Sequence, residues 1–472
     1  MEPREQRAVP DWNDLWNFCP EADSDVHEIE GSLPPGLVGT LYHNGPGKFD
    51  LSHNFFSGDG LIRRLRFAPD GRVQYTSRYV RTKKYEAEVD ADRPKLRTAG
   101  TQLPGGPLAN AFRMPAAEAN THVMMHAGKL HALHESGTPV ELDPETLATI
   151  GNDDFGGALP RATLFSAHPH RDPHTGDMYT FGVDPTGRTP MVRTYRWTKA
   201  GALENIRDFA IPYFSFLHDF AVTQNWMVFI IPPLKASMIP SMLGFKSIFD
   251  SFKVLKGRGS HVYLVSKNGD ELVHLEVDPV YVSHVIAARD AGDDVVVDFV
   301  RPMALDRMFD DLREFRTSGF DFIGGSGGAW RYRFNPRRCH MQCEQLDDRP
   351  QDFPRYDERL PMHEARYVYI GANPAAGVPG LYRGLLKFDL QTRASDYFDA
   401  GPHHVTQEPI FVPDPAGSAE DDGWLVAYVH DGGRPGTKVC IFDARRVSDG
   451  PICSMNLPAF SGMTFHGSWV GA

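Results

Sequence analysis

Cysteine is scarce in this chain, and its scarcity argues against two kinds of cysteine chemistry. The sequence has five cysteines in 472 residues. So few, and an odd number, do not make a disulfide framework, which favours a reducing compartment. The stretch CHMQC, with Cys339, His340 and Cys343, has the spacing of half a zinc site, but the sequence has no second Cys/His pair to complete it. We therefore expect a structural role for this stretch.

Positive charge is also in short supply. The net charge is -12, and no block of lysine and arginine exceeds a few residues. A protein that binds nucleic acid normally gathers basic residues into a patch that meets the phosphates. The composition therefore gives no support to a nucleic-acid partner, and nothing in it indicates an obligate protein partner.

Long apolar runs are missing as well. The longest is WMVFIIPPL, at Trp226 to Leu234, which is far too short to span a bilayer. The first residues, MEPREQRAVPDWNDLW, carry charges and no apolar centre, so they do not resemble a signal peptide. The sequence predicts a cytoplasmic protein.

What the sequence does contain is a recurring pair of short strands joined by a tight polar turn. Flanking runs such as GRVQYTSRYV, DVVVDFV and GWLVAYVH are rich in β-branched and aromatic residues. Glycine, asparagine and aspartate favour tight turns because they tolerate or stabilise unusual backbone angles. The turns are APDGRV, LDPETL, DPHTGD, TKAGAL, SKNGDEL and FDLQTR. Hairpins over the whole length, without a low-complexity linker, predict an all-β propeller as one domain over residues 1–472.

One stretch departs from this pattern. In SMLGFKSIFDSFKVLK, from Ser241 to Lys256, apolar residues recur at helical spacing and lysines stand among them. The spacing predicts an amphipathic helix. The apolar positions are Phe245, Ile248, Phe249, Phe252 and Leu255. Two roles are open for the helix: it caps the propeller, or it contacts the inner membrane surface peripherally to reach an apolar substrate.

Four of the twenty histidines stand at strand edges among small or apolar neighbours. They are His168, His218, His284 and His466. The separations are 50 residues (218 − 168), 66 (284 − 218) and 182 (466 − 284), so only the global fold could bring them together. A propeller does so when inner strands of separate blades converge on one axis. A single histidine in an apolar run is more often a core residue, and spacing alone leaves the choice open.

Stretches in order along nearly the whole chain resemble the carotenoid cleavage oxygenase family. They are GSLPPGLVGTLYHNGPG, FFSGDGLIRRLRF, SRYVRTKKYEAE, NTHVMMHAGKLHALHESGTPVELDPETL, AHPHRDPHTGDMYTFG, LHDFAVTQNWMVF, QEPIFVP, EDDGWLVAYVHD and FHGSW. The resemblance implies a seven-bladed β-propeller with a dome of loops and helices over its top face. It also implies one ferrous ion per chain on His168, His218, His284 and His466.

The resemblance further implies acidic residues behind three of those imidazoles. Glu135 and Glu408 match two of these positions, and Asp352 stands where relatives usually carry glutamate. Carboxylates there would accept the outer N–H bonds and offset the charge of the metal. Because aspartate is one methylene shorter, we expect it to reach its histidine through a water or a shifted backbone. The stretch after His284 also departs from the family pattern, with Ala287, Ala288 and Asp290.

The activity implied by the resemblance is cleavage of a carbon–carbon double bond by dioxygen, giving two carbonyl products. Relatives that cleave phenolic alkenes carry a lysine just before the residue matching Glu135, whereas this chain has His134, which could still bond a hydroxyl. This difference and the predicted amphipathic helix favour a carotenoid or apocarotenoid. A stilbene or phenylpropenoid substrate is the alternative, and a non-cleaving isomerase or ligand-binding propeller is the third possibility.

Overall fold

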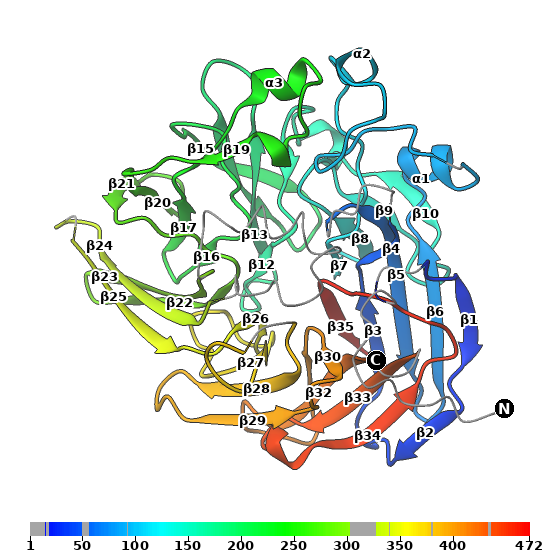
Figure 1. Cartoon of the computed structure of the whole chain (residues 1–472). Helices are drawn as coiled ribbons and strands as arrows, with labels where there is room; N and C mark the ends of the chain where they lie inside the picture. The colour runs from blue at the N-terminus through cyan, green and yellow to red at the C-terminus, as the bar shows by residue number, and fades with distance from the viewer. Residues whose placement is uncertain are drawn as a thin grey trace.

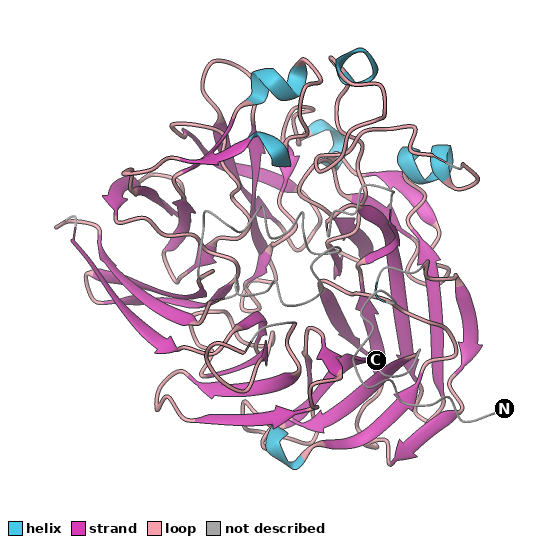
Figure 2. Cartoon of the chain, viewed as in Figure 1, coloured by secondary structure: helices cyan, strands magenta, loops and turns pink. Residues whose placement is uncertain are grey.

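Strands are the main regular element of the computed structural model, and helices are few and short (Figure 2). The structure describes Leu15 and residues 18–49, 56–91, 93–302, 327–338, 340–378, 381–432 and 436–472. Each of the six predicted polar turns joins two antiparallel strands. The turn APDGRV, for example, connects β5 (Gly58–Phe67) to β6 (Val73–Tyr79). Cys339 lies outside the described residues, and Cys343 is an exposed free thiol.

The described strands form seven sheets of four to six strands, which follow one another around a ring (Figure 1), and one separate two-stranded sheet. This is the predicted seven-bladed propeller. The second blade along the chain contains β7 (His122–His126), β8 (Lys129–Leu133), β9 (Val140–Leu142) and β10 (Thr149–Asn152). The third contains β11 (Leu164–Phe165), β12 (His170–Arg171), β13 (Met178–Asp184), β14 (Met191–Trp197) and β15 (Leu203–Ala210). The fourth contains β16 (Ala221–Val222), β17 (Trp226–Ile231), β20 (Ser260–Ser266) and β21 (Leu272–Val277).

Two further blades follow, and the apolar core lies between neighbouring sheets. The fifth blade contains β22 (Val285–Ala291), β23 (Asp294–Val300), β24 (Ala329–Asn335) and β25 (His340–Asp347). The sixth contains β26 (Gln351–Arg355), β27 (Tyr367–Ala372), β28 (Gly384–Asp389) and β29 (Ser395–Asp399).

The remaining two blades mix strands from both ends of the chain. One contains β2 (Glu28–Gly31), β30 (His404–Thr406), β31 (Ile410–Pro413), β32 (Gly423–Asp431), β33 (Thr437–Asp443) and β34 (Pro451–Asn456); the other contains β1 (Ala22–Asp25), β3 (Gly39–His43), β4 (Pro46–Phe49), β5, β6 and β35 (Gly467–Gly471). Gly467 lies so close to β3 that a Cβ there would stand 2.3 Å from the Tyr42 carbonyl oxygen. β35 is therefore the edge strand of this sheet, paired along β3.

Three short helices, α1 (Lys83–Glu88), α2 (Pro107–Asn110) and α3 (Met238–Met242), gather at one end of the ring (Figure 1). In this view they lie in the upper part of the molecule, above and beside β9, β10, β15 and β19 (Phe252–Val254). No helix among the described residues is long and apolar enough to cross a membrane.

The prediction of one amphipathic helix over Ser241–Lys256 is wrong. Helix α3 ends at Met242, a single 3-10 turn covers Phe249–Ser251, and β19 (Phe252–Val254) pairs with β18 (Leu234–Ala236). Gly244 breaks the helix because its φ is +75° and a Cβ there would stand 2.6 Å from the backbone nitrogen of Ala111. Tertiary packing and strand pairing have overridden the helical periodicity.

Candidate metal centre

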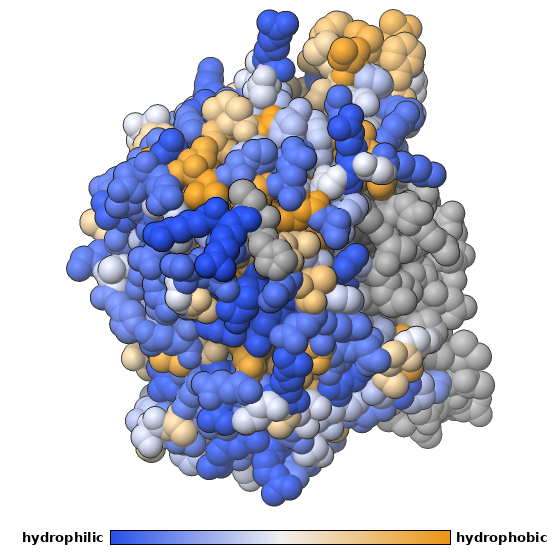
Figure 3. Space-filling view, turned by 90° about the vertical axis from the view of Figure 1, so that its left-hand side faces the viewer, coloured by the Kyte–Doolittle hydropathy of each residue, from blue (hydrophilic) through white to orange (hydrophobic). Residues whose placement is uncertain are grey.

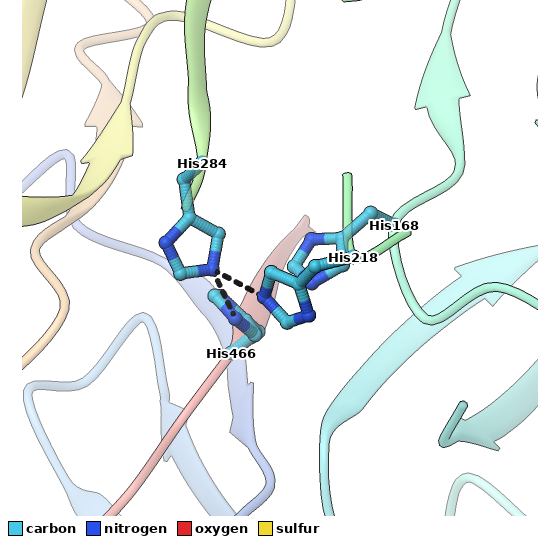
Figure 4. A group of neighbouring side chains, drawn as sticks. All are labelled: His168, His218, His284 and His466. Carbon is cyan, nitrogen blue, oxygen red and sulfur yellow. Dashed lines mark hydrogen bonds between the residues drawn. The ribbon is translucent and has the colours of Figure 1, made fainter. Parts of the chain in front are cut away.

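Each of the four predicted histidines lies one to three residues before a short or innermost strand of a different blade. His168 lies between β11 and β12, His218 precedes β16, His284 precedes β22 and His466 precedes β35. The four imidazoles point toward one another (Figure 4). The ring of blades therefore brings together side chains that are far apart in sequence.

The distances show how tightly these rings converge. Nε2 of His284 lies 3.1 Å from Nε2 of His218 and 3.2 Å from Nε2 of His466 (Figure 4). The centre of the His168 ring is 4.4 Å from that of His218 and 4.6 Å from that of His466. One ligand atom from each of the four histidines lies within 4.8 Å of the others, which is a group that could hold a metal ion.

A carboxylate stands behind three of the four rings. The Nδ1 atoms of His218, His284 and His466 lie 2.5, 2.7 and 2.9 Å from oxygens of Glu135, Asp352 and Glu408, respectively. When Nδ1–H donates to a carboxylate, the neutral imidazole keeps its lone pair on Nε2. The three carboxylates thus select the tautomer that presents a metal-binding nitrogen to the centre.

Asp352 contacts His284 directly despite its shorter side chain. The backbone around it is irregular: the register between β26 and β27 shifts after Asp352, and the next residue, Phe353, has φ of +59°. Positive φ at a non-glycine residue costs free energy and persists where the surroundings enforce it. The Ser283 hydroxyl donates to the other Asp352 oxygen at 2.5 Å, so the carboxylate has a second fixed partner.

Glu408 is buried and surrounded by hydrogen-bond donors and positive charge. Its Oε2 accepts from the Gly467 backbone N–H at 2.8 Å, and His43 Nε2 lies 3.3 Å from the same atom. Burial opposes ionisation, but the Arg355 guanidinium, 3.6 Å from Oε1, together with His466 holds the pKa of Glu408 well below its usual range. The residue is therefore a carboxylate.

The imidazoles differ in how readily they take up a proton. Burial opposes protonation of His284, but the Asp352 carboxylate outweighs it and raises the pKa of His284. Burial, reinforced by the neighbouring imidazoles, lowers the pKa of His168 well below its ordinary value, and burial lowers that of His466 to about 3. Both rings are neutral near pH 7, as metal ligands must be. Nε2 of His168 is buried and has no hydrogen-bond partner among the described residues, an arrangement that is costly unless something else binds it. A divalent transition metal therefore fits this donor set.

A largely apolar cavity opens on one side of the histidines. Its aromatic walls include Phe56, Phe216, Phe249, Tyr281, Phe353 and Phe465. Phe249 and Phe252, predicted to lie on the apolar face of a helix, line this cavity instead of the surface. His218, His284 and His466 border the cavity, so an apolar molecule inside it would lie against the metal-binding group.

A second, more polar cavity touches the histidines as well. His168, His284 and His466 border it together with Arg355, Glu358, Arg359 and Glu408. The histidine group thus lies between an apolar cavity and a polar one. An apolar molecule and a polar molecule could each reach it from a different side.

Several supporting residues escaped the sequence reasoning. Asp219 follows His218, accepts from the backbone N–H of Val285 at 2.7 Å, and bonds Nε2 of His170 at 3.0 Å. It therefore ties the strand that follows His284 to the third blade. His122 lies beside His466, with 5.7 Å between ring centres, and its Nδ1 donates to the Ala167 carbonyl. The only sequence signal for these roles was their place next to a predicted ligand or motif.

Comparison with known proteins gives a match over nearly the whole chain. A family model described as retinal pigment epithelial membrane protein matches residues 16–471. The apocarotenoid-15,15'-oxygenase of Synechocystis sp. is 31% identical over 462 residues, which cover 95% of this chain and 94% of that protein. The isoeugenol monooxygenase of Pseudomonas putida is 29% identical, and the match covers 94% of each chain.

Solved structures give a similar result. A cobalt-substituted Synechocystis apocarotenoid oxygenase superimposes with a TM-score of 0.91 and 30% identity, over 98% of both chains. A chimera of that oxygenase with the retinal pigment epithelial protein has a TM-score of 0.90 and 28% identity, again over 98% of both chains. The likeness covers the full ring and the connections above it.

Proposed function

Because this chain belongs to the carotenoid oxygenase family, we propose that it is a non-haem iron(II) dioxygenase that cleaves a carbon–carbon double bond of a carotenoid or apocarotenoid. One observation carries the proposal: four imidazoles converge on one point, and three of them border an apolar cavity. Imidazole ligands suit ferrous iron, and four of them leave up to two octahedral positions open. The iron, when bound, would supply the redox chemistry that lets dioxygen react with an alkene.

In this proposal the ligands are His168, His218, His284 and His466, one iron per chain. Glu135, Asp352 and Glu408 hold the imidazole tautomers and offset the metal charge. The aromatic walls hold the polyene and exclude water, so that the protein contributes mainly positioning. Dioxygen is the co-substrate, and the products are aldehydes or ketones.

We assign His134 to substrate recognition. The backbone N–H of Ser136 donates to its Nδ1 at 3.3 Å, which places the imidazole proton on Nε2. That Nε2 is buried and has no partner among the described residues. Burial lowers the pKa of His134 to about 4, so the ring is neutral and donates one hydrogen bond. An oxygen at one end of the substrate, a carbonyl or a hydroxyl, would accept it.

An apolar surface favours the carotenoid class over smaller phenolic alkenes. Orange residues stand at the top of the molecule, the end that carries α2 and α3 (Figure 3). The exposed members of this patch are Leu108 (98% exposed), Met114, Phe112, Ile239, Phe245 and Met242. The Phe112 backbone N–H donates to the Met242 carbonyl at 2.8 Å, so the two connections form one surface.

This α2–α3 patch and the cavity share one segment of chain. Residues 238–252 carry exposed Ile239 and Phe245 at one end and cavity-lining Phe249 at the other. Lys246, Lys253 and Lys256 are exposed beside them and would attract anionic lipid. We propose that the patch touches a membrane surface from the cytoplasmic side, which would let an apolar substrate pass from lipid toward the cavity.

The experiment that tests the function offers β-apocarotenals and the phenolic alkenes resveratrol and isoeugenol in parallel to purified protein reconstituted with ferrous iron. The expected result is aldehyde products from the apocarotenals, with no turnover by His218→Ala. Cleavage of the phenolic alkenes alone would replace the substrate with the stilbene or phenylpropenoid class. Absence of cleavage from every substrate, with iron retained, would favour a non-cleaving isomerase or binding protein.

A further inference from the structure

A second histidine cluster lies on the outer hairpin of the fourth blade, away from the central group. Strands β20 and β21 are the outermost pair of that sheet. In their antiparallel register His261 stands opposite Glu276, and Tyr263 stands opposite His274. Since side chains two apart on a strand share a face, all four side chains lie on one face of the hairpin.

Three ligand-type side chains meet on this face. Nδ1 of His261 lies 3.0 Å from Nε2 of His274 and 3.7 Å from Oε1 of Glu276. One ligand atom from each of the three lies within 4.8 Å of the others. Two imidazole nitrogens and a carboxylate oxygen are a donor set that zinc takes, with water completing the shell.

The rings are held in place by aromatic neighbours. His274 stacks on Tyr263 with 4.4 Å between centroids and 10° between planes, and Tyr263 stacks in turn on Phe209. His261 stacks on His274 with 5.2 Å between centroids and 23° between planes, and it makes an edge contact with Tyr213. Because these contacts already order both rings, metal binding would cost little side-chain conformational entropy.

The charges around the cluster are also those that a cation site needs. Partial burial, with the neighbouring His274, lowers the pKa of His261 although Glu276 opposes the shift, so its imidazole is neutral near pH 7. In the described part of the chain, Glu276 has no lysine or arginine as an ion-pair partner. A similar group is formed by His131, Glu141 and Asp153. There the Lys129 ammonium lies 2.7 Å from the Glu141 carboxylate and already supplies the positive charge that a metal would bring.

We propose that His261, His274 and Glu276 form a second metal site, which binds a divalent transition metal of the zinc class on the surface of the fourth blade. The site is independent of the central four-histidine group and of the proposed cleavage reaction. A metal there would clip β20 to β21 at the edge of the blade.

The test counts metals in the full-length protein. Protein loaded with ferrous iron under anaerobic conditions is equilibrated with a stoichiometric excess of Zn²⁺, desalted and analysed for both elements. Wild type should hold one zinc beyond its iron. His274→Phe keeps the stack on Tyr263 but removes a ligand, and it should lower zinc affinity about tenfold or more, as should Glu276→Gln.

Controls separate this site from the centre. The exposed His27 belongs to neither histidine group, so His27→Phe should bind zinc as wild type does. His218→Ala should lose its iron and keep the surface zinc. Equal zinc in wild type and His274→Phe would overturn the proposal, and so would zinc that binds only by displacing iron. With Co²⁺ as the probe, the visible spectrum of the surface site should disappear in His274→Phe.

Discussion

The side chains at the centre orient the imidazoles so that one nitrogen of each can bind a metal. Nδ1 of three histidines is occupied by a carboxylate, and Nε2 faces the centre. Asp352 is the most informative of the three carboxylates because its short side chain reaches His284 only with an irregular strand and a strained Phe353 beside it. Such detail lies beyond sequence reasoning, which could say only that a shorter acid needs a compensation.

Asp352→Asn should lower iron affinity about 10–100-fold, because the amide removes the negative charge that supports His284. Iron retained after dialysis against a graded series of chelator concentrations measures the change. Asp352→Glu keeps the charge that supports His284 and should retain more iron than the asparagine variant. Wild-type retention by Asp352→Asn would show that this carboxylate does not support the metal.

His134 should make the metal-free protein sensitive to acid. Its pKa is lowered to about 4 in the fold, from an ordinary value of 6.5, so below pH 6.5 the unfolded chain binds a proton that the folded chain does not. Stability is therefore lost as the pH falls from 6.5 to 4, by up to about 3 kcal/mol from this group. Urea unfolding of the apo protein at pH 7, 5.5 and 4.5 should show a smaller loss for His134→Leu. An unchanged pH slope would contradict the assignment.

At the scale of elements, local periodicity and tertiary packing gave different answers. Hairpin turns were readable from sequence because glycine, asparagine and aspartate favour them locally. The segment 241–256 was not, since its apolar residues, although at helical spacing, lie in three different environments. Phe249 faces the cavity, Phe252 joins β19, and Phe245 is exposed. Only the fold reveals that Gly244 must pack against Ala111.

Phe112→Asp combined with Phe245→Asp should weaken binding to vesicles that contain anionic lipid, since both side chains are exposed in the α2–α3 patch. Co-sedimentation with vesicles measures the bound fraction. Ile150→Asp is the matched control, because Ile150 is 62% exposed but lies on β10, outside the patch. Equal sedimentation of the double variant and the control would exclude the membrane role.

At the scale of the molecule, the ring closes through strands from both chain ends, and the candidate ligands come from four blades. Composition and turn chemistry could predict a propeller, and the family resemblance supplied the number of blades and the histidine set. Neither could predict how Asp219 and His170 join the third blade to the strand after His284, because that contact exists only once the blades are assembled.

Removing residues 465–472 should cost both the metal and the closure, whereas His466→Ala in the full chain should cost the metal alone. The truncation deletes β35 and the buried Phe465, so we expect a loss of at least about 3 kcal/mol, a value typical of removing one buried phenylalanine. Metal analysis and thermal unfolding of the two metal-free variants separate the effects. Equal unfolding midpoints would mean that β35 adds nothing to the ring.

The order of the four histidines along the chain also sets an order of events during biosynthesis. A protein is made and folds from its N-terminal part onward. His466 is synthesised 182 residues after His284 (466 − 284), when the other three histidines already exist. A metal that needs all four imidazoles can therefore bind only once β35 has been made and has paired with β3.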